Sequence, residues 1–343
     1  MKHHSHTWTA RLIAIGVACV IMVALSPAAM AKTINLNYSI FFPPSHGQCK
    51  AGIAWAKEIE KRTDGAVSIT VFPGGTLTKA NQTYDGVSQG IADIGMSCFA
   101  YSRGRFPVME AIDLPMGYPS GVVATRVANA FYRALNPDEL KDVTVLYIHA
   151  HGPGLLHTKK PVKSLNDLQG MKIRSTGMSA KVTSALGAVP VAMSQPQAYE
   201  ALQKGVVEGT FTPIETLKGW KQAEVIQYTT DCADIGYTTA MFVVMNRTKW
   251  DALPSNVKKI FEEVSAEWID RHGAVWDKAD AEGRDFTLAQ GNEIIALDDA
   301  ENERWKEAVS PIIDDYIKKA NEKGLPGEKI IATLRKNIAD AKK

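Results

Sequence analysis

The stretch that decides the fold is LNDLQGMKIRSTGMSAKVTSALGAVPVAM, residues 165–193. Its segment MKIRSTG has the pattern of a strand end, the residues after it favour a helix, and AVPVAM is typical of a short strand. A strand, a helix and a further strand in succession predict an α/β unit. Arg174 follows the apolar Ile173 at the strand end and precedes two hydroxyl-bearing residues and a glycine. A guanidinium held in such surroundings suits the capture of a carboxylate.

The same unit continues to about residue 238. Ser194 is placed to cap a helix, because Gln197 stands at the capping-box position and Pro196 falls in the first turn, where proline is tolerated. The segment VVEGTFT then predicts the next strand. We therefore expect one α/β unit over residues 152–238.

A first α/β unit precedes it. INLNYSI and AVSITVF, residues 34–40 and 66–72, alternate between apolar and polar residues, as strands do. DIGMSCF, residues 93–99, has the pattern of a buried strand, and helical stripes lie between these segments, the second of them marked by Tyr84, Val87 and Ile91. Strands that alternate with helices predict a mostly parallel sheet.

The chain crosses between the two units more than once. AMFVVMN, residues 240–246, predicts a strand that returns to the first unit, and a helical pattern from Ser255 to about Gly291 is long enough to bridge both. Helices around Trp305 to Ile317 and Ile330 to Ile338 end the chain. Such an arrangement predicts a hinged two-lobe α/β protein, whose cleft is a natural ligand site.

The N-terminus has the pattern of a secretory signal. Lys2 and Arg11 precede an apolar run over residues 12–25, and a small-x-small sequence ends at Ala31, after which we expect cleavage. The run is shorter than the ~20 residues that span a bilayer, which disfavours the alternative of an uncleaved membrane anchor. Removing the two basic residues takes the 39 basic residues to 37, which equals the 37 acidic ones. A neutral chain argues against nucleic acid or an anionic membrane surface as the partner.

The expected division of the chain is therefore as follows: a signal peptide over residues 1–31; lobe I from residues 32–151 and about 239–280; lobe II from residues 152–238 and about 281–343, with the C-terminal helices. Cys49, Cys98 and Cys232 remain after processing, so at most one disulfide forms within a monomer, and the sequence leaves open whether any two pair.

The sequence contains one candidate for a catalytic site. The sequence has no glycine-rich nucleotide motif and no nucleophile elbow, but His149 and His151 form a His-x-His pair at a strand end. Alternation points both rings to one side, yet a metal site needs about two further ligands, and none stands in a recognisable spacing. We therefore expect no metal and no cofactor, with one core histidine and one that lines a pocket. A secreted metal-dependent hydrolase stays as the alternative.

Residues 165–217 resemble the solute-binding proteins of tripartite ATP-independent periplasmic (TRAP) transporters, the DctP-like family. The segments DLQGMKIR, GAVPVAM, AYEALQKGVVEG and FTP follow that family's pattern in order. The resemblance continues in FPGGTLTKANQTYDGVSQGIADIGM, residues 72–96, and in VMNRTKWDALPSNVKKIFEEVSAEW, residues 244–268. Nearly the whole chain after the signal is covered.

The resemblance implies an α/β two-lobe periplasmic binding protein (type II-like), with a ligand cleft between the lobes and a long hinge-spanning helix. It implies a periplasmic, non-enzymatic and monomeric protein that closes around a small organic carboxylate. The partners would be the small and large membrane subunits of a TRAP permease, which take up the ligand by secondary-active transport. A further alternative is a binding protein that presents the same ligand to a sensor receptor, because such a protein has the same sequence pattern.

Several polar site residues follow from the resemblance. Arg174 aligns with the family's carboxylate-clamping arginine. Thr212 occupies a position where many members carry an asparagine, and Gln195 one that is often aromatic. Some members carry a second arginine where this chain has Gly154, with His151 just before it. The missing arginine favours one carboxylate on a larger apolar body, such as an aromatic, indole or 2-oxo acid, over the alternative of a C4-dicarboxylate.

The apolar walls are predicted from aromatic residues near strand ends and loops, for which ordinary core packing is the competing interpretation. Phe42 and Phe211 are the best of these candidates, and Tyr237 is a further one. Ser97, at the end of its strand, is a candidate hydrogen-bond partner from the opposite lobe. The predicted substrate-binding set is thus Arg174, Thr212, Phe211, Gln195, His151, Phe42, Ser97 and Tyr237.

Overall fold

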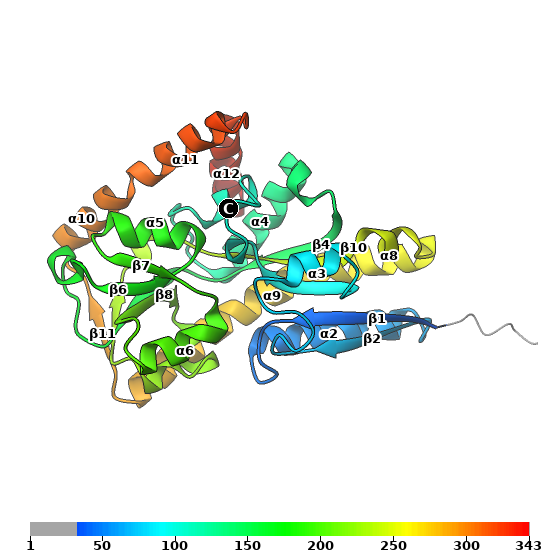
Figure 1. Cartoon of the computed structure of the whole chain (residues 1–343), viewed down its shortest axis with the longest axis horizontal. Helices are drawn as coiled ribbons and strands as arrows, with labels where there is room; N and C mark the ends of the chain where they lie inside the picture. Colours follow the sequence, from blue (N-terminus) through cyan, green and yellow to red (C-terminus); the bar gives the residue numbers. More distant parts are fainter. Residues whose placement is uncertain (1–32, 343) are drawn as a thin grey trace, which may run out of the picture. The chain divides into compact units, whose positions relative to one another are not determined.

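Two mixed β-sheets organise residues 33–342, the part of the chain that the computed structural model describes (Figure 1). The expected signal peptide lies outside the described residues. Each sheet is the centre of one lobe of an α/β two-lobe fold, as the sequence predicted. No helix within the described residues is both long and apolar enough to span a bilayer.

The sheet of lobe I contains a strand that comes back from lobe II. Its order is β2 (Val67–Phe72), β1 (Ile34–Ile40), β3 (Ile94–Cys98), β10 (Ala240–Asn246) and β4 (Val143–Ala150). β1 and β3 are parallel, whereas β10 runs antiparallel to both β3 and β4. The predicted return of β10 is therefore confirmed, but the sheet is mixed because the returning strand enters it from the end that faces lobe II.

The sheet of lobe II contains the predicted α/β unit. Its order is β11 (Glu293–Ala296), β9 (Tyr228–Asp231), β5 (Gly154–Thr158), β8 (Gly209–Pro213), β6 (Lys172–Ser175) and β7 (Val189–Ala192). β6 is parallel to both β7 and β8, and α5 (Gly177–Ala185) connects β6 to β7. β5, β9 and β11 were not predicted from the sequence.

The shorter helices follow the local signals in part. At α6 (Gln195–Gln203) the predicted capping box is present, and the Ser194 N–H donates to the Gln197 side chain at 3.3 Å. α3 (Thr83–Ser88) ends before Ile91, which is 56% exposed and is not part of the expected apolar stripe. α2 (Gly47–Arg62) is the helix predicted between the first two strands. The helices that were not predicted or are short are α4 (Gly121–Leu135), α7 (Glu215–Gly219) and α8 (Arg247–Asp251).

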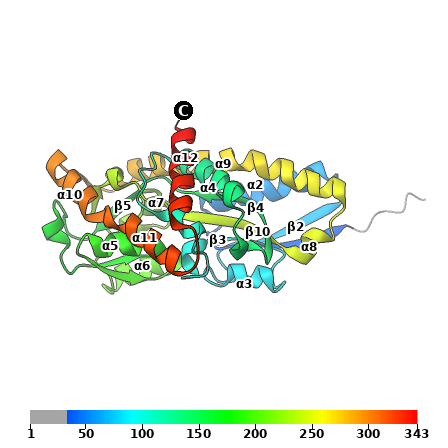
Figure 2. The ribbon, with the colours of Figure 1, turned by 90° about the horizontal axis from the view of Figure 1, so that it is seen from above.

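The long helix α9 (Ser255–Ala289) joins the two lobes and confirms the prediction of a bridging helix. It packs against α2, α4 and β4 of lobe I and against α7 and β11 of lobe II (Figures 1 and 2). Two glycines permit this close packing: a Cβ at Gly273 would lie 2.8 Å from the Val122 Cα, and one at Gly283 would lie 2.6 Å from the Ile214 carbonyl oxygen. One rigid element thus contacts both sides of the cleft.

The C-terminal helices cover both lobes. The helix expected around Trp305 to Ile317 is two helices, α10 (Asp299–Val309) and α11 (Pro311–Glu322), because proline begins the second. α12 (Gly327–Ala341) packs against α4, an element of lobe I. The division expected from the sequence placed residues from about 281 to 343 in lobe II. We propose instead that α12 belongs with lobe I and that only the segment before it belongs with lobe II.

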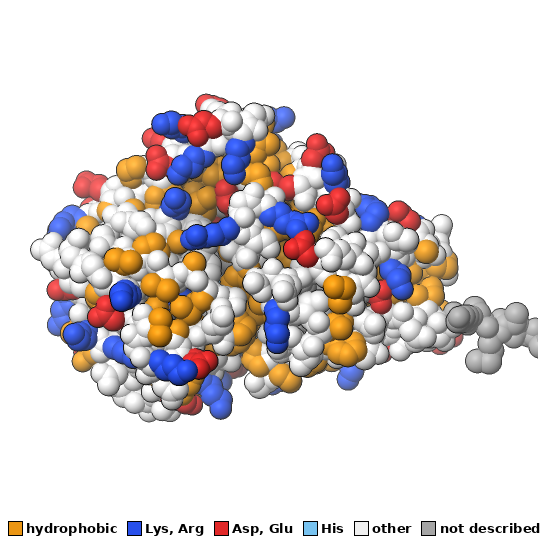
Figure 3. All heavy atoms as spheres, in the orientation of Figure 1, with side chains coloured by type: hydrophobic (Ala, Val, Ile, Leu, Met, Phe, Trp, Pro, Cys, Tyr) orange, Lys and Arg blue, Asp and Glu red, His pale blue; other side chains and the backbone are white. Residues whose placement is uncertain are grey.

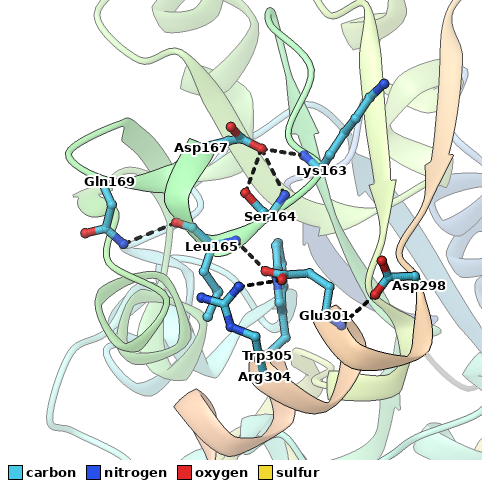
Figure 4. A network of polar contacts seen from close by, with 9 residues as sticks. All are labelled: Lys163, Ser164, Leu165, Asp167, Gln169, Asp298, Glu301, Arg304 and Trp305. Atoms are coloured by element: carbon cyan, nitrogen blue, oxygen red, sulfur yellow. Dashed lines mark hydrogen bonds and ion pairs between the residues drawn. The ribbon is translucent and has the colours of Figure 1, made fainter.

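A buried carboxylate fastens α10 to lobe II (Figure 4). Oε1 of Glu301 accepts hydrogen bonds from the Leu165 N–H at 2.6 Å and from the Trp305 indole N–H at 3.1 Å. Arg304 donates to Oε2 at 2.7 Å. On the face of the molecule shown in Figure 3, basic and acidic side chains are interspersed, as the balanced charge of the sequence predicts.

Candidate ligand-binding site

A narrow pocket lies where the strand ends of the two lobes meet. Its volume is about 410 Å³. Residues from both lobes line it: Phe41, Phe42, Cys98, Tyr101, His151, Arg174, Thr176, Ser179, Gln195, Phe211, Thr212, Pro213, Glu215, Thr216, Trp220, Tyr237, Thr239, Met241 and Trp276. Every residue of the predicted set except Ser97 is among them. The small free volume suits a small or flat ligand.

Arg174 is a buried cation in this pocket. It lies on β6, is 3% exposed, and directs Nε and Nη2 to the Met193 carbonyl oxygen at 3.1 and 2.9 Å. Within residues 33–342 no carboxylate forms an ion pair with it. A guanidinium carries five N–H donors, so the remaining ones are open to the pocket. Burying an unpaired charge is costly, and an anionic ligand would remove that cost.

Two further donors lack partners in the same pocket. Nε2 of Gln195 and Nε1 of Trp220 are buried and have no hydrogen-bond partner within the described residues. The backbone N–H of Gln195 donates to the Tyr101 hydroxyl across the cleft at 3.1 Å. Buried donors are normally satisfied, so unpaired ones that line a pocket indicate a ligand with acceptor oxygens. Gln195 was predicted as a site residue, whereas Trp220 was not.

Thr212 lies in the pocket but differs from the prediction in what it offers. The Thr216 hydroxyl donates to the Pro213 carbonyl at 2.9 Å, which uses its only proton. The contact of 2.9 Å between the hydroxyls of Thr212 and Thr216 is therefore a donation from Thr212. Only the lone pairs of Thr212 are left for a ligand. Thr216, on α7, thus determines what Thr212 can offer a ligand. The sequence pattern FTP does not include Thr216.

The His-x-His pair divides into a core and a pocket residue, as predicted. Nδ1 of His149 accepts a hydrogen bond from the Trp276 indole at 3.0 Å, and burial lowers the pKa of His149 well below its ordinary value. His151 lines the pocket, and its Nδ1 lies 2.5 Å from the Gly152 carbonyl oxygen. Within residues 33–342, no group of three or more histidine, cysteine or acidic side chains is arranged to hold a metal ion.

Aromatic rings form the walls. Phe42 stacks on His46 with ring centroids 4.5 Å apart, and Phe211 meets Tyr237 edge to face at 6.0 Å. A Cβ at Gly154 would overlap the Tyr237 ring. Tyr237 thus fills the space that a side chain at position 154 would need, which explains the absence of a second arginine there.

Ser97 lies outside the pocket. It is fully buried, and its hydroxyl donates to the Ala80 carbonyl oxygen at 2.5 Å. Ser97 is at the end of β3, which is why it was predicted to face the cleft. Its side chain points instead to the loop before α3.

A carboxylate also faces the pocket. Nδ1 of His46 accepts from the Gln48 N–H at 3.2 Å, so its proton is on Nε2, which donates to Oε2 of Glu215 at 2.8 Å. The Glu215 N–H donates to Asp280 at 3.1 Å. Burial, with the Glu215 charge as the next cause, raises the pKa of Asp280 to about 8. Neither Glu215 nor Asp280 was predicted as a site residue, because only the fold brings Glu215 to the pocket and places Asp280 against it.

The two lobes touch around the pocket. The His46–Glu215 and Tyr101–Gln195 hydrogen bonds both cross from lobe I to lobe II. Gly177 has a φ of +52°, and a Cβ there would lie 2.9 Å from the Ala100 Cβ of lobe I. The pocket is therefore enclosed by contacts between the lobes.

Two lobes joined by a long helix, with a buried arginine between them that has no ion-pair partner within residues 33–342, are features of a binding protein for a small anion. Residues 38–319 match the family model of bacterial extracellular solute-binding protein, family 7, and the chain belongs to that family. It is a TRAP solute-binding protein and not an enzyme, which sets aside the metal-dependent hydrolase.

Similar proteins extend over nearly the whole chain. The C4-dicarboxylate-binding periplasmic protein DctP of Rhodobacter capsulatus is 28% identical over 311 residues, which cover 87% of this chain and 91% of that protein. A TRAP solute-binding protein from Rhodoferax ferrireducens, in complex with copurified benzoate, is 29% identical with a TM-score of 0.87, covering 90% and 99% of the two chains. One from Bordetella bronchiseptica, with bound (R)- and (S)-mandelate, is 31% identical with a TM-score of 0.83 and the same coverage.

Proposed function

We propose that this protein captures a small monocarboxylate with an aromatic or similarly apolar body and delivers it to a TRAP permease. The observation that carries the proposal is Arg174, a buried cation with no anionic partner within residues 33–342, in a pocket walled by aromatic rings. A ligand carboxylate would neutralise this charge and accept from the unpaired donors of Gln195 and Trp220. On this proposal, every predicted site residue except Ser97 contributes to the ligand site.

A single ligand carboxylate is favoured because the pocket that contains Arg174 also contains a carboxylate of the protein. Glu215 lines the same pocket, and its partner His46 is a neutral donor, so nothing there attracts a second ligand carboxylate. A like charge in a buried site costs several kcal/mol and acts against the wrong ligand. Tyr237 fills the space beside Gly154. The C4-dicarboxylate bound by the Rhodobacter capsulatus relative is therefore the second candidate, and the ligands of the benzoate and mandelate complexes are closer to the first.

The cellular setting is part of the proposal. The N-terminal signal would direct export to the periplasm with cleavage after Ala31. There the protein would act as a monomer whose lobes close around the ligand, and the closed form would dock on the small and large permease subunits.

The test is a ligand panel on the purified protein, after unfolding and refolding to remove any copurified ligand. The panel contains benzoate, phenylacetate, indole-3-acetate, a 2-oxo acid and succinate, with benzamide as the neutral match of benzoate. At a concentration of ~100 times Kd a ligand stabilises the folded state by about 2.7 kcal/mol. For a chain of this size that is a rise in Tm of roughly 4 °C. We expect such a rise with an aromatic acid and none with benzamide. Equal shifts with both, or a shift with succinate alone, would contradict the proposal.

A further inference from the structure

The structure fixes the hydrogen-bonding state of His151, a residue that lines the pocket. Its Nδ1 lies 2.5 Å from the Gly152 carbonyl oxygen, which only accepts hydrogen bonds. The proton of a neutral imidazole is therefore on Nδ1, and Nε2 carries a lone pair. Within residues 33–342 no donor is bonded to that nitrogen, and the ring lines the pocket.

The ring is held neutral by its surroundings. Burial lowers the pKa of His151 to about 4; the hydrogen bond to Gly152 opposes this, and the Arg174 cation adds to it. Edge-to-face contacts with Tyr237 and Trp276, at centroid distances of 5.8 and 6.1 Å, fix the plane of the ring. At neutral pH the Nε2 atom is thus a fixed acceptor.

A second acceptor lies in the same narrow space. Thr212 donates its proton to Thr216, so its oxygen presents only lone pairs to the ligand. The pocket therefore has a set of donors, contributed by Arg174, Gln195 and Trp220, and a set of acceptors, contributed by His151, Thr212 and the Glu215 carboxylate. The first set is matched by a carboxylate. A benzoate-like ligand with no other polar group leaves the second set unmatched.

We propose that His151 is a specificity-determining residue, and that the ligand carries a hydroxyl group in addition to its carboxylate. This inference rests on the proposed function and names its substrate class as hydroxylated aromatic monocarboxylates. The ligand hydroxyl donates to Nε2 of His151 and replaces the water that would otherwise have to enter the closed pocket. A site built around a buried acceptor discriminates against the analogue that lacks the donor.

The experiment measures Kd by calorimetry for matched acids that differ by one hydroxyl: benzoate and 3-hydroxybenzoate, phenylacetate and mandelate, phenylacetate and 3-hydroxyphenylacetate. We expect the wild-type protein to bind the hydroxylated acid at least about tenfold more tightly in one or more pairs. His151→Phe keeps a ring of similar size without the acceptor, and should remove this preference while it still binds the unhydroxylated acid. His151→Gln, whose amide oxygen reaches the position of Nε2, should restore part of it.

The possible outcomes distinguish a failure of this inference from a failure of the proposed monocarboxylate binding. If the wild-type protein binds the acids of every pair equally, or if His151→Phe keeps the preference, the inference is overturned and the binding of monocarboxylates stands. If no carboxylic acid binds, the proposed function fails and the inference fails with it. The wild-type comparison decides the matter even if a variant does not fold.

Discussion

Replacing Arg174 with methionine should abolish ligand binding without weakening the free protein. Methionine keeps much of the apolar stem and removes the cation. Truncating one partner of a buried, hydrogen-bonded charge pair costs about 2 to 5 kcal/mol, which is roughly a 30-fold to 4,000-fold increase in Kd for a carboxylate. The lower limit applies if water enters the vacated space, and the upper limit if the carboxylate stays buried and unpaired.

The free protein should respond in the opposite direction. The variant loses the two hydrogen bonds from Arg174 to the Met193 carbonyl, worth about 1 to 2 kcal/mol. It also loses a buried cation that has no counter-ion within the described residues, whose desolvation costs several kcal/mol. We therefore expect the free energy of unfolding to stay unchanged or to rise.

Calorimetry with the best acid of the panel and urea unfolding of the empty protein measure the two effects. Arg174→Lys is the matched control, since it keeps the charge but loses the planar fork, and should give an intermediate affinity. If Arg174→Met binds within threefold of the wild type, the carboxylate does not bind at this residue. If the empty variant loses more than about 3 kcal/mol of stability, the arginine is a structural residue and the reasoning from an unpaired charge is wrong.

Three further predictions concern closure, pH and the C-terminal helices. Gly177→Ala and Gly170→Ala both place a side chain at a positive φ, at a cost of about 1 kcal/mol, but only Gly177 meets the opposite lobe. We expect Gly177→Ala to raise the ligand Kd at least about tenfold and Gly170→Ala to leave it unchanged, and equal values would show that this contact is not needed. The pKa of Asp280 is raised from 3.8 to about 8, so its contribution to stability is full below pH 4 and is lost as the pH rises through 8. Urea unfolding should show that Asp280→Asn removes a decline of about 1.4 kcal/mol per pH unit between pH 5 and 8; parallel curves would contradict this. Glu301→Ala should cost about 2 to 3 kcal/mol of unfolding free energy with ligand affinity unchanged, whereas the exposed Glu303→Ala should stay within about 0.5 kcal/mol, and equal losses would refute the role of the network.

The parts of the fold that the sequence predicted are those with a local periodic signal. The unit β6–α5–β7, the capping box of α6 and the 35 residues of α9 all follow from patterns of apolar spacing and capping. α4 was not predicted, although Ser120 caps it and buried apolar residues recur along one face. β5 and β9 are short and buried, and they exist as strands only because β8 and β11 pair with them.

The site divides in the same way. Arg174 was predicted because its strand-end position and hydroxyl neighbours are local features. The role of Glu215 depends on His46, which is 169 residues away in the chain, and no sequence pattern connects the two. Thr212 on β8 donates its proton to Thr216 on α7, and the Ser97 hydroxyl donates to a loop carbonyl. Such pairings arise from tertiary packing, so the sequence predicts which residues gather at a site better than what each one offers.

The distribution of charge around the pocket connects binding to closure. Contacts such as His46–Glu215 and Tyr101–Gln195 favour the state in which the lobes touch. The same state encloses Arg174, and without an anion this burial opposes closure by a few kcal/mol. A carboxylate removes that opposition, and because each 1.4 kcal/mol changes a two-state equilibrium about tenfold, one ion pair is enough to move the population from mostly open to mostly closed. We therefore expect Arg174 to do more than hold the ligand: its unpaired charge would lower the population of the closed form in the absence of an anion.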